Sequence, residues 1–158
     1  MVAVSVLLVV VVVAAVLASS FLPRKTPSGS PSGTSQGSPE CKGTAACVTG
    51  TVTYIVDGDT LDVGSTRIRL TLVNSPEVGE PGYSEAKNFT AHTCPVGSQA
   101  LVDEDDGQTG GSYGRMIALV YCGAVNLNAG LLNSGNAVLV EYYCSISEFA
   151  TEPWTGCP

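Results

Sequence analysis

Basic residues are scarce in this sequence of 158 residues: seven lysines and arginines stand against 14 aspartates and glutamates, which gives a formal net charge of −7. A protein that holds nucleic acid through charge alone is normally basic. The scarcity of cations therefore disfavours tight, nonspecific binding of polyanions. A few placed cations and a bound metal can still handle a single phosphate group.

Histidine–cysteine patterns for zinc are also missing. The sequence has one histidine, and none of its six cysteines belongs to a CxxC pair, so a zinc site is disfavoured. All six cysteines lie beyond residue 40, and their even number is typical of disulfides in an oxidising compartment. The sequence leaves their connectivity open. Proximity along the chain favours Cys41–Cys47 and Cys144–Cys157, which leaves Cys94–Cys122.

The first 22 residues contain no charged side chain. Val2–Leu17 is almost unbroken valine, leucine and alanine, and the small residues that follow Leu17 are typical of a cleavage site. We expect residues 1–22 to be a signal peptide. Because Arg24 and Lys25 follow the apolar stretch and no basic residue precedes it, retention as a membrane anchor stays an alternative. The cysteines favour export, so we expect a protein that is secreted or held at the extracellular face of the cell membrane.

Residues 23–40 consist largely of proline, glycine and serine. Such a segment has too little apolar surface to order itself, and we interpret it as a flexible linker. The folded domain is then expected over residues 41–158, which is long enough for one modest hydrophobic core.

The domain alternates apolar, β-branched runs with turn-forming residues. Helices are predicted over residues 84–93, with Ser84 as the N-cap, and over residues 127–133. Strands are predicted over residues 48–55, 61–63, 67–73, 99–103 and 116–121. Five strands with two or three short helices predict an α+β, mainly β fold, namely a disulfide-stapled, five-stranded barrel of the OB type.

Oxygen-bearing side chains gather at the ends of two predicted strands. Asp57-Gly58-Asp59 follows one strand, and Asn74 and Ser75 follow another. Hard divalent cations prefer oxygen ligands, and these segments offer the carboxylate of Asp59, the amide carbonyl of Asn74 and the backbone carbonyl of Ser75. An Asp-Gly-Asp sequence alone is more often a simple turn. The joint spacing of the motifs favours a metal site.

Three further residues favour phosphodiester chemistry. Glu77 can orient or deprotonate a water molecule near the metal. Arg69 and Arg115 can donate charge-assisted hydrogen bonds to phosphate oxygens. A cation with two arginines suits the charge that builds on a phosphodiester during hydrolysis. Taken singly, each of the three also has an ordinary explanation as a surface or loop residue.

These motifs, followed by Tyr113-Gly114-Arg115 and by Asn128 with Gly135, occur in an order and spacing that resemble the thermonuclease (staphylococcal nuclease-like) family. The resemblance covers roughly Val52–Tyr143. It implies an OB-fold barrel and Ca²⁺-dependent hydrolysis of DNA and RNA to 3′-phosphate products, with single-stranded or denatured substrate preferred.

The resemblance also implies roles for individual residues. Asp59 corresponds to the principal aspartate ligand of calcium, and Ser75 to the residue whose backbone carbonyl binds the ion. Glu77 corresponds to the glutamate that acts on the attacking water. Arg69 and Arg115 correspond to the two phosphate-binding arginines.

Tyr113 and Tyr143 correspond in this resemblance to tyrosines near the nucleotide. Two departures from the family pattern matter. Asn74 stands where the reference member has a second aspartate ligand, so we expect weaker calcium binding. Lysines that line the nucleotide groove in that member are scarce here, which predicts a higher KM for polymeric substrate.

The acidic run Asp103-Glu104-Asp105-Asp106 offers a second group of carboxylates. It can be interpreted as a second calcium site, but we expect a solvated acidic loop.

Three functions remain open at this point. The first is a secreted or surface-tethered, monomeric calcium nuclease. The second is a catalytically weak binding module for nucleic acid, and the third is a stapled domain that holds calcium only for stability. The paired arginines favour the first, because a purely structural calcium site needs no cations aimed at it.

Overall fold

The computed structural model describes residues 39–158. The predicted leader over residues 1–22 and residues 23–38 of the predicted linker lie outside that range. Within residues 39–158, no helix has both the length and the apolar character needed to cross a membrane.

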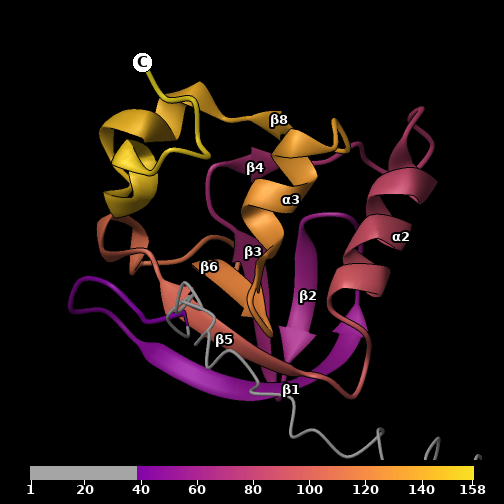
Figure 1. Ribbon diagram of the computed structural model, residues 1–158, viewed down its shortest axis with the longest axis horizontal. Coiled ribbons are helices and arrows are strands. Elements are labelled where there is room, and N and C mark those ends of the chain that lie inside the picture. Colours follow the sequence, from indigo (N-terminus) through magenta and orange to yellow (C-terminus); the bar gives the residue numbers. More distant parts are fainter. Residues whose placement is uncertain (1–38) are drawn as a thin grey trace, which may run out of the picture. The chain divides into compact units, whose positions relative to one another are not determined.

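The described chain forms short strands, two α-helices and three 3₁₀-helices (Figure 1). The strands are β1 (Cys47–Ile55), β2 (Thr60–Val63), β3 (Thr66–Leu70), β4 (Val73–Asn74), β5 (Gln99–Glu104), β6 (Met116–Cys122), β7 (Val125–Asn126) and β8 (Val138–Leu139). The helices are α2 (Tyr83–Thr93), α3 (Leu127–Asn133), η1 (Asp106–Gln108), η2 (Glu141–Ser145) and η3 (Glu148–Thr151).

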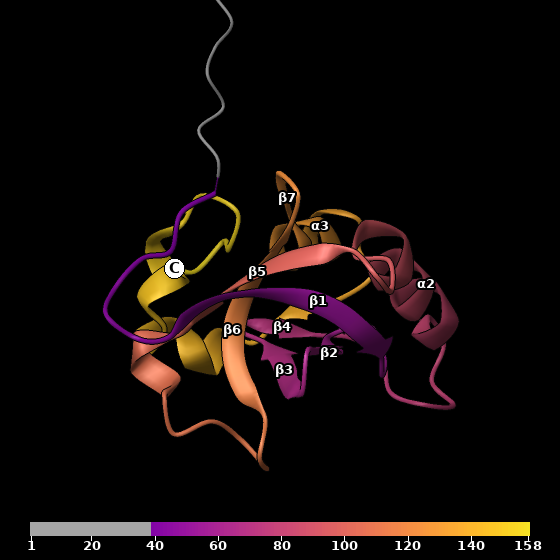
Figure 2. The same cartoon turned by 90° about the horizontal axis from the view of Figure 1, so that it is seen from below.

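Five of the strands close into a barrel. The sheet runs in the order β3-β2-β1-β5-β6-β7, and β3 also pairs with β6 in parallel, with Leu70 opposite Ala118. The long strand β1 pairs with β2 through its second half and with β5 through its first half. Its register shifts between Val52 and Tyr54, and such an irregularity bends a strand. Figure 2 shows the resulting curvature of β1. The predicted barrel of the OB type is confirmed.

The barrel interior is filled by one face of each strand. Apolar side chains from the strands and from α3 are fully excluded from solvent and pack into one cluster. Its members with no exposed surface include Val52, Leu61, Ile68, Val102, Val120, Leu127 and Leu131. Burial of each such side chain contributes about 1.5–3 kcal/mol to folding. Apolar runs that the fold buries, such as that of β6, explain why the sequence pattern located most strands.

Three disulfides staple the domain: Cys41–Cys47, Cys94–Cys122 and Cys144–Cys157. This pairing confirms the one that chain proximity favoured. Cys94–Cys122 lies in the core and joins the residue after α2 to the end of β6. Cys144–Cys157 ties the last residues to η2, beside a second, smaller apolar cluster around Phe149. The three bonds indicate an oxidising compartment.

Two local predictions were wrong. Ser84 does not cap α2, because the helix begins at Tyr83 and its N-cap is Gly82, which adopts a left-handed conformation with φ of 92°. The strand predicted over residues 67–73 is broken, since β3 ends at Leu70 and Leu72 has φ of 62°. That turn sends the chain back into β4.

The acidic run is not a solvated loop, so that prediction was also wrong. Asp103 and Asp105 are fully buried. Asp103 accepts a hydrogen bond from the backbone N–H of Lys42 at 2.8 Å. Asp105 accepts hydrogen bonds from four donors, namely Thr71 Oγ1, Gln108 Nε2 and the backbone N–H groups of Gly107 and Glu148. These carboxylates lock the N-terminal loop and η3 against the barrel.

Two aspartates should show opposite pH dependence of stability. Burial raises the pKa of Asp103, so its charge costs stability at neutral pH, and the folded state gains stability as pH falls through that raised pKa. Hydrogen bonds from Arg67 lower the pKa of Asp62, so that pair stabilises above the unfolded value of 3.8 and is lost as pH falls through the lowered pKa. Asp103→Asn should therefore stabilise the neutral protein, and Asp62→Asn should destabilise it by less than about 1 kcal/mol.

Urea unfolding between about pH 7 and about pH 3 measures both differences, and both should shrink in acid. Shifts of the same sign for the two variants at neutral pH would contradict this assignment.

Candidate functional site

The Asp-Gly-Asp turn precedes β2 and packs against two other segments. Asp59 is almost fully buried, and its carboxylate accepts hydrogen bonds from the backbone N–H of Ser75 at 2.6 Å and from Thr60 Oγ1 at 3.1 Å. A Cβ atom on Gly58 would lie 2.6 Å from the Ala86 side chain and 2.7 Å from that of Ser75. Only glycine therefore lets the turn approach α2 and the residues after β4 so closely.

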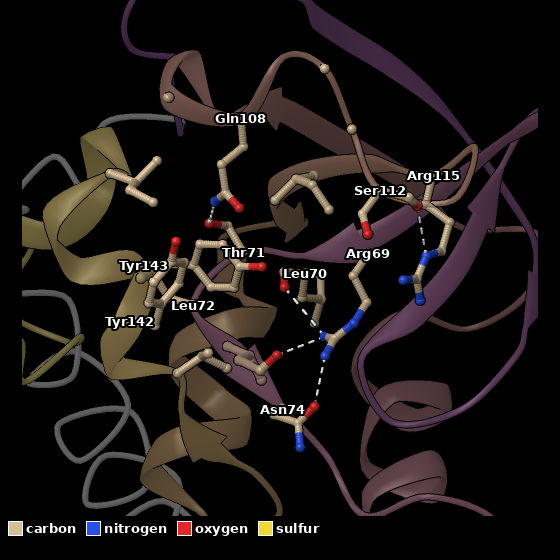
Figure 3. A pocket seen from close by; sticks show the side chains of 17 residues that line it. Arg69, Leu70, Thr71, Leu72, Asn74, Gln108, Ser112, Arg115, Tyr142 and Tyr143 are labelled. Carbon is tan, nitrogen blue, oxygen red and sulfur yellow. Dashed lines mark hydrogen bonds between the residues drawn. The ribbon is translucent and has the colours of Figure 1, made fainter.

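Arg69 of β3 joins this turn to the β3–β4 connection. Figure 3 shows its hydrogen bond to Asn74 on the side of the connection. Its Nη1 atom lies 3.0 Å from Asp59 Oδ1 and donates to the carbonyl of Val73 at 2.6 Å. Its Nη2 atom donates to Asn74 Oδ1 at 2.9 Å. The positive φ of Leu72 makes this possible, because it turns the chain so that β4 returns alongside the guanidinium.

Several charged groups surround Arg69. Burial lowers the pKa of Arg69, and the charge of Arg115 lowers it further, whereas Asp59, Asp57 and Glu77 act to raise it. Burial also raises the pKa of Asp57, and the neighbouring charge of Asp59 adds to that effect. These five predicted residues therefore belong to one electrostatic neighbourhood.

The two arginines open onto the same pocket. This pocket has a volume of about 630 Å³ and takes its walls from the β3–β4 connection, the glycine-rich loop before β6 and the segment around η2. Its polar and aromatic lining consists of Arg69, Thr71, Asn74, Gln108, Ser112, Arg115, Tyr142 and Tyr143. Figure 3 shows the tyrosines on the side opposite Arg115.

The structure thus brings together most of the predicted site residues. Arg69, Asn74, Arg115 and Tyr143 line the pocket. Asp59 pairs with Arg69 and accepts the hydrogen bond from the backbone N–H of Ser75.

Tyr113 and Glu77 are placed differently. Tyr113 does not line the pocket: it is 97% exposed, and its ring lies 5.8 Å from the guanidinium carbon of Arg115. Glu77 is exposed on the loop after Pro76 and also lies outside the pocket. Its backbone N–H donates to the carboxylate of Glu80 at 2.8 Å, which fixes the loop just before α2.

Gln108 was not predicted as a site residue. Its Nε2 atom donates to Thr71 Oγ1 at 3.0 Å and to Asp105 Oδ2 at 2.8 Å, and the residue lines the pocket. The local sequence is a glycine-rich polar loop, which carries no periodic signal that would single out one residue. Contacts with residues far away in the chain place this side chain.

The oxygen donors at Arg69 are of the type that hard divalent cations prefer. Asp59 Oδ1 lies 3.0 Å from Nη1 of Arg69 and Asn74 Oδ1 lies 2.9 Å from Nη2, so both oxygens are paired with the guanidinium. The carboxylate of Asp57 adds negative charge nearby, which a cation would offset. Within residues 39–158 no group of three or more histidine, cysteine, aspartate or glutamate side chains is arranged to hold a metal. Amide and backbone oxygens would therefore have to complete the ligand set.

Asn128 holds the pocket floor in place. This residue of α3 is fully buried, and its Oδ1 atom accepts a hydrogen bond from the backbone N–H of Val120 at 3.1 Å. Its Nδ2 atom donates to the carbonyls of Thr71 at 3.0 Å and Ala118 at 3.3 Å. One side chain thus fixes β6 and the turn that follows Arg69.

Comparisons with known proteins indicate the family of the chain. A family model described as staphylococcal nuclease homologue matches residues 67–152. The match includes Arg69, Asn74, Glu77 and Arg115, whereas Asp59 lies just before it. An uncharacterised protein of Bacillus anthracis is 28% identical over 105 residues, which cover 61% of this chain and 49% of that protein. The chain thus spans about half the length of this curated relative.

Replacing Asn128 with alanine should destabilise the fold. The change leaves buried backbone groups of three residues without their side-chain partner, and we expect a loss of about 3 kcal/mol. Asn133→Ala is the matched control, since Asn133 is exposed at the end of the same helix. Urea unfolding measures both variants, and equal losses would show that the hydrogen bonds of Asn128 do not matter.

Proposed function

The chain belongs to the family of staphylococcal nuclease homologues, and from that premise we propose that it is a Ca²⁺-dependent nuclease that hydrolyses phosphodiester bonds in DNA and RNA to 3′-phosphate products. Family membership supports a nuclease-like function. The observation that carries the finer proposal is the convergence of Arg69 and Arg115 on one pocket, next to the buried carboxylate of Asp59.

Arg69 and Arg115 bind the phosphate in this proposal. A phosphodiester carries one negative charge, and more charge builds on its oxygens as water attacks. Two guanidinium groups match that increase. Arg69 is held by the Val73 carbonyl and by Asn74, so little reorganisation is needed when the charge develops. Its planar fork also suits paired phosphate oxygens.

Asp59, Asn74 and the backbone carbonyl of Ser75 would hold the Ca²⁺ ion. When bound, the ion would supply electrostatic stabilisation of a phosphoryl oxygen and lower the pKa of a coordinated water. Asn74 contributes a neutral oxygen, so the chain offers one negative charge fewer than a pair of aspartates. Weak affinity is compatible with extracellular modules, which bind calcium at about 10⁻⁴–10⁻³ M.

Glu77 acts on the attacking water by orienting it or by taking its proton. Its backbone is held by the carboxylate of Glu80, which limits where the side chain of Glu77 can reach. The charge of Glu77 acts on Arg69, which places the two groups in one electrostatic neighbourhood.

Tyr143 and Tyr113 bind the nucleotide. Tyr143 lines the pocket and packs edge-on against Tyr142, with ring centroids 5.1 Å apart. Aromatic side chains next to a phosphate site stack bases with little sequence preference. Since a paired base cannot enter such a pocket, the preferred substrate is single-stranded or denatured.

We place the protein outside the cell, secreted or at the extracellular face of the membrane, as a monomer. The three disulfides support this location. Cleavage of residues 1–22 or their retention as an anchor would decide between the two forms. A catalytically weak module that binds nucleic acid or calcium is the second candidate, because Asn74 reduces the negative charge available to a metal.

Digestion of denatured DNA with calcium or with a chelator tests the proposal. Glu77→Gln and Arg115→Ala should each lower kcat/KM at least about a hundredfold, the usual cost of losing one transition-state contact. Matched controls are Glu85→Gln on the exposed side of α2 and Arg67→Ala, whose guanidinium pairs with Asp62 away from the pocket. Both controls should stay close to wild type. Full activity of either site variant would contradict the role assigned to that residue. Digestion that a chelator leaves unchanged would contradict the proposed dependence on calcium.

Adding a carboxylate at position 74 should strengthen calcium binding. In Asn74→Asp a charged oxygen replaces the amide oxygen, and we expect roughly tenfold tighter binding, about 1.4 kcal/mol. Calorimetric titration measures the affinity. Asn133→Asp adds the same charge at an exposed position that does not line the pocket. It controls for the general electrostatic attraction between calcium and an added negative charge. Equal affinities of wild type and Asn74→Asp would mean that Asn74 is not a ligand.

A further inference from the structure

A second cavity adjoins the site. It has a volume of about 200 Å³ and shares one residue, Asn74, with the larger pocket. Its other lining residues come from the loop after β4 and from the segment between α3 and β8, namely Ser75, Pro76, Glu80, Gly135, Asn136, Ala137 and Val138. The two cavities therefore meet at Asn74, the residue that binds Arg69.

Strand pairing places the wall of this smaller cavity. In the antiparallel pair β4–β8, Asn74 lies opposite Val138 and Val73 lies opposite Leu139. Residues directly opposite each other project from the same face of a sheet, with Cβ atoms about 4.5–5.5 Å apart. Because Asn74 Oδ1 accepts from Arg69 Nη2, Val138 is only one side chain away from the guanidinium. Val138 is also 65% exposed, which leaves its methyl groups open to a ligand.

The chemistry of the smaller cavity suits a neutral planar group. Pro76 and Val138 supply apolar surfaces, and Asn136 and Glu80 supply polar groups at the edge. One oxygen of Glu80 accepts the hydrogen bond from Glu77, and its negative charge disfavours a phosphate. A nucleobase meets these requirements, because it is uncharged, has apolar faces and carries hydrogen-bonding groups along its edge.

We infer that the smaller cavity binds the nucleobase on the far side of the scissile phosphate. This inference rests on the proposed function. A phosphodiester joins two nucleosides, so a phosphate held at Arg69 leaves one nucleoside for each of the two cavities that meet at Asn74. The larger pocket takes one base against Tyr143, and the smaller cavity takes the other against Val138. Both bases must then be unpaired, which adds a second reason for the preference for single strands.

A cycle that combines protein variants with altered substrates tests the inference. The substrates are three dinucleoside monophosphates: thymidylyl-thymidine and the two forms in which one or the other sugar lacks its base. The variants are Val138→Ser and Asn136→Ala. Val125→Ser is the matched control, since Val125 also occupies a two-residue strand and is 51% exposed, but it lines neither cavity. Each variant is first checked for an unchanged urea midpoint.

Removal of one of the two bases should lower kcat/KM of the wild-type protein about fivefold, the scale expected for one lost apolar contact. Val138→Ser should lower kcat/KM for intact thymidylyl-thymidine by a similar factor. It should have no effect on the form that lacks the base assigned to the smaller cavity. Asn136→Ala should show the same coupling, and Val125→Ser should show none.

Two results would overturn the inference while leaving the nuclease intact: equal effects of Val138→Ser on all three substrates, or no effect on any. If the wild-type protein cleaves neither denatured DNA nor RNA, the proposed function is wrong, and the inferred second base site is wrong with it. The polymer assay therefore separates the two failures.

Discussion

The candidate site depends on one partly buried cation, Arg69, that must be paired. Taking a guanidinium out of water costs several kcal/mol unless hydrogen bonds and opposite charge replace its solvation. Arg69 meets that need with Asp59, the carbonyl of Val73 and the amide of Asn74, which come from two separate stretches of chain. Folding of the β3–β4 connection and folding of the Asp-Gly-Asp turn are thereby coupled. In the proposed function, the same groups would provide the cation and the oxygen donors for phosphodiester hydrolysis.

The barrel supports this arrangement from behind. β3 carries Arg69, and its parallel pairing with β6 fixes where the strand ends. The next residue, Thr71, bonds through its hydroxyl to buried Asp105, and its carbonyl accepts from buried Asn128. These contacts hold the turn at Leu72, whose positive φ is costly for a residue with a branched side chain. The geometry of the site therefore depends on polar groups that never reach the substrate.

Much of the fold could be predicted from sequence, and the failures have a common cause. Strands and α3 follow from local apolar periodicity, and cysteines close in the chain did pair. Ser84 failed as a cap because the helix begins at Tyr83, so its N-cap is Gly82, two residues before Ser84. The acidic run was wrongly predicted to be a solvated loop, because its burial depends on hydrogen-bond donors from Thr71 and Glu148. These residues lie 34 and 43 residues from Asp105 in the chain. The joint spacing of motifs found four of the residues that line the larger pocket, namely Arg69, Asn74, Arg115 and Tyr143. Gln108 and the smaller cavity depend on tertiary contacts that leave no local pattern.

An acidic protein that acts on a polyanion needs to obtain affinity from something other than charge. Each neutralised phosphate adds a counterion-release term, and only Arg69 and Arg115 line the larger pocket as cations. Glu77 and Glu80 lie on the loop beside the smaller cavity and repel additional phosphates there. A strand can then place one phosphate at the arginines and must direct its neutral bases to the walls. In the proposed nuclease, the tyrosines and Val138 would supply binding that lysines supply in a basic nuclease, and a preference for unpaired bases would follow from the missing positive charge.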